Sequence, residues 1–168
     1  MVQGVSLNIP SGKLIEGIKS VYYSATTSDV KPEIASVYIY PLEDNIVFVA
    51  TDSFRLAEKK IKLKNMPEFP PILIPYKNII EIIRVYDDVS EDIEIILSKN
   101  QCSFVSKDTY LTSRLIDGVF PDYKQIIPKS FKTEVIVLKN DLLNTIKLST
   151  IISDKFNQIT LSVNVAEK

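Results

Sequence analysis

Apolar residues follow a pattern along this chain that predicts a repeated order of strands and one helix. Residues 5–9 alternate apolar and polar side chains, as a short strand does, and the run stops at Pro10. Ser11 is then expected to cap a helix, because apolar residues recur after it at helical spacing. That apolar stripe comprises Leu14, Ile15, Ile18, Val21 and Tyr22. Three strands are predicted next, at residues 34–40, 46–50 and 54–63.

The same order then recurs. A short strand at residues 71–74 ends at Pro75, and the spacing predicts an amphipathic helix over residues 76–86. Three strands are predicted to follow it, at residues 93–97, 102–106 and 110–115. A third copy begins with a strand at 134–138, a helix at 141–152 and a strand at 159–165, and then the sequence stops.

The pattern therefore predicts an α+β fold built from a strand-helix-strand-strand-strand unit, present twice and once cut short. The two full copies cover about residues 4–64 and 71–115, and with the connector after them they make a first domain of residues 1–130. Residues 131–168 are expected to begin a second, incomplete domain. A sheet left at that point would carry an unpaired edge, so the chain is expected to be a fragment.

The two domains are joined by residues 113–128, SRLIDGVFPDYKQIIP. Gly118 is expected to supply a backbone that can take a positive φ, while Pro121 and Pro128 fix φ and favour extended geometry before them. This composition predicts a stiff, ordered connector.

Composition argues against catalysis. The 168 residues include no histidine, one cysteine and four glycines, which excludes a Ser-His or Cys-His pair, a zinc site of the CxxC type and a glycine-rich phosphate loop. No catalytic residue, metal or cofactor is therefore expected. Cys102 is read as a small buried apolar residue. The 20 basic and 21 acidic residues give a net charge of −1, without the basic surplus of a usual nucleic-acid binder. No signal peptide or membrane span is recognisable, so a cytoplasmic protein is expected.

Two segments carry a family resemblance. The run VFVATDSFRLA, beginning at Val47, and the connector SRLIDGVFPDYKQIIP at 113–128 resemble two motifs of the bacterial DNA polymerase III beta subunit, the sliding clamp. The first motif departs from the family pattern at Ser53, where glycine is usual, and Phe54 follows it. The resemblance covers the clamp's middle domain and the start of its third domain.

This resemblance implies a non-enzymatic processivity factor of DNA replication, a homodimeric ring around duplex DNA in the cytoplasm, at the nucleoid. A sliding ring needs only weak phosphate contacts, in keeping with the near-zero net charge. Its helices would line the hole, with Lys77 and Arg84 as the best DNA-facing pair and Lys13 and Lys19 as a weaker one. Its partners would be the polymerase III catalytic subunit, the clamp loader and repair proteins.

Clamps hold these partners by short linear peptides, and the resemblance places half of the peptide pocket in this chain. An apolar depression rimmed by hydrogen-bond donors suits such a peptide. The residues carried over from the motifs, with one strand residue added by position, are Ile34, Thr51, Ser53, Phe54, Arg55, Leu56, Pro121, Gln125 and Ile126.

Two other functions stay open from sequence. One is a β-rich protein-interaction module with no role on DNA. The other is a hydrolase that uses the paired carboxylates of Asp87 and Asp88 or of Glu91 and Asp92, although these are more typical of a solvated loop and lack a convergent base or metal partner.

Overall fold

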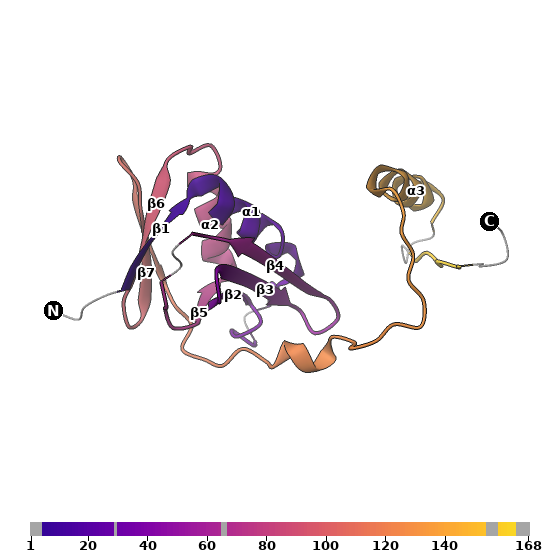
Figure 1. Ribbon diagram of the computed structural model, residues 1–168, viewed down its shortest axis with the longest axis horizontal. Coiled ribbons are helices and arrows are strands. Elements are labelled where there is room, and N and C mark those ends of the chain that lie inside the picture. Colours follow the sequence, from indigo (N-terminus) through magenta and orange to yellow (C-terminus); the bar gives the residue numbers. More distant parts are fainter. Residues whose placement is uncertain (1–4, 29, 65–66, 154–157, 164–168) are drawn as a thin grey trace. The chain divides into compact units, whose positions relative to one another are not determined.

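The computed structural model describes residues 5–28, 30–64, 67–153 and 158–163, and the chain divides into two compact units, Met1–Asp122 and Tyr123–Lys168 (Figure 1). Each unit is described by itself. The first contains β1 (Val5–Pro10), α1 (Ser11–Lys19), η1 (Tyr22–Ser24), β2 (Ser36–Leu42), β3 (Asn45–Thr51), β4 (Leu56–Lys62), β5 (Ile72–Pro75), α2 (Tyr76–Tyr86), β6 (Asp92–Leu97), β7 (Gln101–Val105) and β8 (Tyr110–Arg114). The second contains η2 (Tyr123–Ile126) and α3 (Lys139–Ile152).

The first unit holds two antiparallel four-stranded sheets, with strand orders β1-β6-β7-β8 and β4-β3-β2-β5. Each predicted repeat therefore gives its first strand to the other repeat's sheet: β1 pairs with β6, with Val5 opposite Leu97, and β5 pairs with β2, with Ile72 opposite Ile39. The two halves are tied together by backbone pairing in both directions. Neither half has a complete sheet of its own.

Helices α1 and α2 lie side by side between the two sheets (Figure 1). Each buries one stripe, represented by Leu14 and Ile18 on α1 and by Ile79 and Ile82 on α2, all of them fully buried. These residues join one hydrophobic core that both sheets share. Burial of that shared apolar surface is the main force holding the two repeats as one unit.

Ser11 has a different role from the predicted helix cap. The residue before α1 is Pro10, and no side chain caps the N-terminus of this helix. Ser11 is buried, and its hydroxyl donates a 2.9 Å hydrogen bond to the backbone carbonyl of Tyr86 at the end of α2. The tyrosine hydroxyl in turn donates to the carbonyl of Phe104. Ser11 thus links the two helices instead of satisfying its own helix terminus.

The predicted strands are present in the first unit with shifted ends, and the helix over residues 76–86 is confirmed as α2. Two shifts matter for the site. β2 begins at Ser36, so Ile34 lies before the strand, and β4 begins at Leu56, so Phe54 and Arg55 lie in the turn that precedes it. The side chains of all three belong to loops.

Residues 115–120 follow β8 as an ordered connector of the first unit. The backbone amide of Ile116 donates to the carbonyl of Leu73 at 2.9 Å, and the ring of Phe120 stacks on Tyr38 with centroids 4.8 Å apart. The expected positive φ at Gly118 was wrong, since no described glycine has one. A Cβ there would instead meet the Glu33 side chain at 2.8 Å, so this glycine permits a close approach.

In the second unit the predicted helix is confirmed as α3, which buries none of its residues. The strand predicted at 134–138 was wrong, because that stretch is irregular up to the start of α3. The strand predicted at 159–165 is also absent over 159–163, and residues 164–165 lie outside the described residues. Over the described part of the chain, no helix is both long and apolar enough to cross a membrane.

Candidate functional site

The turn between β3 and β4, residues 51–55, is closed by its own side chains. The carboxylate of Asp52 accepts hydrogen bonds through Oδ1 from the amides of Phe54 and Arg55, at 3.0 and 2.9 Å. Its Oδ2 accepts from the Arg55 guanidinium at 2.9 Å. Thr51 is buried, and its hydroxyl donates to the carbonyl of Arg55 at 2.8 Å and accepts from the amide of Ser53 at 3.1 Å. The turn is therefore held at both its base and its tip.

The hydrogen bonds of this turn shift the pKa of the Asp52 carboxyl group. The amide of Arg55 lowers the pKa of Asp52 most, with smaller contributions in the same direction from the amide of Phe54 and the Arg55 guanidinium. Partial burial opposes the shift. The charged form of Asp52 is thus the form that organises the turn.

The tip of the turn presents Ser53 and Phe54 to solvent. Ser53 has a φ of 77°, in the left-handed region that glycine enters far more easily. Phe54 is 98% exposed. A side chain of this size is seldom left so fully in water, so a strained turn here presents an aromatic ring to solvent.

A groove of about 470 Å³ lies beside this turn. Its second wall is the loop before β2, which is held by a backbone bond from Thr26 to the carbonyl of Ile34 and by two bonds that return to the carbonyl of Lys31. The groove is therefore built by two loops that adjoin the β4-β3-β2-β5 sheet. It is lined by Thr26, Ser28, Val30, Lys31, Ile34, Asp52, Ser53 and Phe54.

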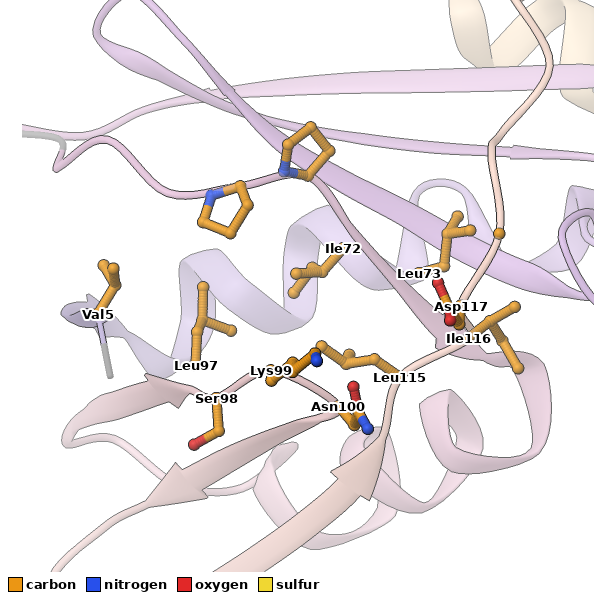
Figure 2. Close-up of a pocket in the computed structure, with 13 residues that line it drawn as sticks. Val5, Ile72, Leu73, Leu97, Ser98, Lys99, Asn100, Leu115, Ile116 and Asp117 are labelled. Atoms are coloured by element: carbon orange, nitrogen blue, oxygen red, sulfur yellow. The ribbon is translucent and has the colours of Figure 1, made fainter. Parts of the chain in front are cut away.

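A second cavity, of about 530 Å³, lies between β5, the end of β8 and the turn from β6 to β7 (Figure 2). Its floor is apolar, with side chains such as Ile72, Leu97 and Leu115, and its rim carries Lys99 and Asp117. None of the residues predicted for a site from the sequence lines it. Its side chains include no nucleophile paired with a base, and among the described residues of the chain no cluster of His, Cys, Asp or Glu could hold a metal ion.

Comparison with known proteins places these features in a family. The model of the DNA polymerase III beta subunit central domain matches residues 8–122, which is most of the first unit. The chain belongs to the DNA polymerase III beta subunit family. It is 31% identical to the beta sliding clamp of Bacillus subtilis (strain 168) in an alignment of 166 residues, which covers 96% of this chain and 44% of that protein. It is 29% identical to the beta sliding clamp of Rickettsia felis, over 88% of this chain and 40% of that protein.

Comparison with solved structures supports the same family. The DNA polymerase sliding clamp of Bacillus subtilis has a TM-score of 0.84 and 30% identity, with 92% of this chain and 41% of that chain covered. The DNA polymerase III beta subunit of Thermotoga maritima has a TM-score of 0.81 and 26% identity, with 90% and 41% covered. The predicted α+β clamp fold is confirmed. The chain spans less than half the length of the relatives it matches.

In this beta-subunit chain the first unit brings together three of the residues predicted for a peptide pocket. Ile34, Ser53 and Phe54 line the groove. Thr51 is buried under the turn and Arg55 is paired with Asp52, so both stabilise the turn that forms one wall of the groove. Leu56 is half-buried at the start of β4, and Pro121 is exposed. Gln125 and Ile126 lie in η2 of the second unit, where both are exposed.

Sequence patterns did not reveal the second wall of the groove. Thr26, Ser28, Val30 and Lys31 fall between the predicted helix and the strand predicted at 34–40, in a polar stretch that carries no motif. The sequence signal in this stretch was Val30, an apolar residue among polar ones. In the structure the Val30 side chain is 85% exposed. Such a residue has no periodicity to mark it, so its place beside Phe54 becomes visible only once the loop is folded.

The residues predicted to face DNA lie on the exposed faces of α1 and α2, and their cationic groups are already engaged within the unit. Lys19 forms a 2.5 Å ion pair with Asp87, and Lys13 donates to the carbonyl of Lys62 at 2.9 Å. Arg84 is paired with Glu81 within its own helix. Lys77 is exposed at the start of α2. The two helices thus present a surface of mixed charge.

Proposed function

We propose that this chain acts within a sliding clamp, a non-catalytic ring that encircles duplex DNA and holds replication and repair proteins on it. The observation that carries the proposal is the match of the central-domain family model to residues 8–122, in a unit whose two repeats form the expected pair of sheets. On this proposal the protein acts in the cytoplasm, at the nucleoid, and residues 131–168 contribute to a further domain of the ring. A homodimer would complete it.

The mixed-charge helix surface supports a sliding role. A surface that neutralises several phosphates at once binds DNA tightly and lowers its mobility, because each released counterion adds to affinity. Here Lys19 is paired with Asp87, and Arg84 is paired with Glu81. Each cation can contact a DNA phosphate only by leaving its carboxylate partner or by binding both groups at once. Each contact with DNA is therefore weak and replaceable. Lys77, Arg84, Lys13 and Lys19 are the proposed DNA-facing residues.

The groove beside the 51–55 turn supports the second role, the docking of partner peptides. The turn is pre-ordered by Asp52 and Thr51, so a ligand does not have to order it, and this favours binding. The residues proposed for peptide binding from the sequence motifs also include Leu56, Pro121, Gln125 and Ile126. The proposed partners are the polymerase III catalytic subunit, the clamp loader and repair proteins.

Peptide docking is tested by fluorescence polarisation with the full-length protein and a labelled peptide that carries an aliphatic and an aromatic anchor. Ile126→Ala removes a proposed pocket residue that is 67% exposed, so it should leave folding intact and weaken binding about tenfold. Ile80→Ala is the matched control, since Ile80 is also exposed but lies on α2. Equal binding by both variants would rule out the pocket assignment.

A further inference from the structure

The groove carries an apolar strip that joins Phe54 of the first motif to residues outside both motifs. Phe54 and Val30, one on each wall, are 98% and 85% exposed, and Ile34 lies at 9% exposure in the same groove. Single exposed apolar residues are common on protein surfaces. Here two such residues line one groove from separate loops, and a third, largely buried residue lies in the same groove. Together they form an apolar surface that can receive an apolar side chain.

The backbone that carries the Phe54 ring is held in position by hydrogen bonds. The amide of Phe54 is bonded to Asp52, and the preceding residue, Ser53, is fixed at a positive φ by its bond to Thr51. A residue held in this way loses little backbone freedom when a ligand covers its ring. Contact between this ring and an aromatic or aliphatic group of a ligand therefore costs less conformational entropy, which favours binding.

The charged side chains beside the apolar strip differ in whether they have an ion-pair partner. Asp52 is neutralised by the Arg55 guanidinium and two amides. Lys31 lines the groove, is exposed, and has no ion-pair partner in the described part of the chain. Among the described residues that line the groove, Lys31 is therefore a cation without an ion-pair partner next to the apolar strip, which favours an acidic group on the ligand.

Phe54 and Lys31, we infer, set the preference of this groove among partner peptides. The preferred peptide places a bulky aliphatic or aromatic side chain against Phe54 and Val30, and an acidic side chain or its terminal carboxylate toward Lys31. This inference rests on the proposed peptide-docking function. It assigns specificity to two residues of the groove, and one of them, Phe54, stands in the turn where the family motif is altered.

The test is a double-mutant cycle measured by fluorescence polarisation with the full-length protein. The probe is a labelled hexapeptide with aliphatic and aromatic anchors and one acidic residue, and each of its positions is replaced by alanine in turn. The protein variants are Phe54→Ala, Phe54→Leu and Lys31→Ala. All alter exposed side chains, so they should fold as the unaltered protein does. Tyr110→Ala is the matched control, because Tyr110 is an aromatic residue that is 67% exposed on β8, away from the groove.

The expected result is a loss of affinity of about tenfold for Phe54→Ala, which Phe54→Leu largely restores. This loss disappears for the one peptide whose apolar contact residue is already alanine. Lys31→Ala should reduce affinity about threefold, and only for peptides that keep the acidic group, with the loss shrinking at high salt. Tyr110→Ala should have no effect.

Two results would overturn the inference, and they are distinguishable. If every peptide binds but Phe54→Ala weakens all of them equally or none of them, Phe54 does not select, while the docking function stands. If no peptide of the set binds the unaltered protein at all, both the docking function and the selection fail.

Discussion

Gly17 allows helix α1 to lie directly on the ring of Phe48 in β3, and the contact gives a sharp mutational test. A Cβ added at Gly17 would lie 2.3 Å from Cε2 of Phe48 and 2.6 Å from two further ring atoms. Phe48 is completely buried, so its ring has no solvent-filled space into which to move. Gly17→Ala must therefore displace either the helix or the sheet.

The size of the effect follows from two opposing contributions to stability. Overpacking of a dense core destabilises a protein by about 1–3 kcal/mol. Alanine in place of glycine inside a helix stabilises it by up to about 1 kcal/mol. Because the steric clash outweighs the gain in helix propensity, the Gly17→Ala variant should lose about 1–2 kcal/mol of unfolding free energy.

Gly12 provides the control, because it lies in the same helix and a Cβ there would meet nothing within 4 Å. Gly12→Ala should be neutral or slightly stabilising. The two variants are compared by urea unfolding followed by circular dichroism, where a shift of the midpoint at constant slope reports stability. If Gly17→Ala were as stable as Gly12→Ala, the proposed packing of α1 on β3 would be wrong.

Three further tests address the turn and the core. Ser53→Gly should raise the unfolding free energy by about 1 kcal/mol, because glycine adopts the φ of 77° without strain; an unchanged urea midpoint would argue against that strain. The lowered pKa of Asp52 means that its stabilisation is present above the unfolded value of 3.8 and is lost as pH falls below it. Acid titration of stability should thus be shallower in Asp52→Asn, and parallel curves would contradict this. Burial raises the pKa of Cys102 to about 12, so its thiol should resist a disulfide reagent at about pH 8 until the protein is unfolded; rapid labelling of the folded protein would contradict its burial.

Local pattern was sufficient to predict most elements of the first unit. The helix over residues 76–86 was predictable because Pro75 sets its start and isoleucines recur on one face. The exchange of β1 and β5 between the repeats was not predictable in this way. Alternation shows which side chains of a strand face the core, whereas the partner strand is chosen by the whole fold.

The strand predicted at 134–138 failed for a related reason. Residues 135–138 are all apolar and include two valines, but a strand requires a neighbour to satisfy its backbone groups. In the described part of the second unit no strand is present to supply that pairing. An apolar run alone did not determine the structure.

The candidate site was predictable only in part. The 51–55 turn lies in the first of the two motifs, and Asp52 closes it through its bonds to two amides. The wall formed by Val30 and Lys31 was missed, since loop residues that meet through tertiary structure leave no periodic signal. Ser11 was assigned as a helix cap from its position, and the tertiary bond to Tyr86 took precedence.

Retention on DNA tests the central proposal most directly. The full-length protein is loaded onto nicked circular duplex DNA, separated by gel filtration, and compared with the same sample after one restriction cut. A ring that encircles DNA should stay on the circle and slide off the linear molecule at moderate salt, because its phosphate contacts are weak. Equal retention on circular and linear DNA, or equal loss from both, would contradict encirclement.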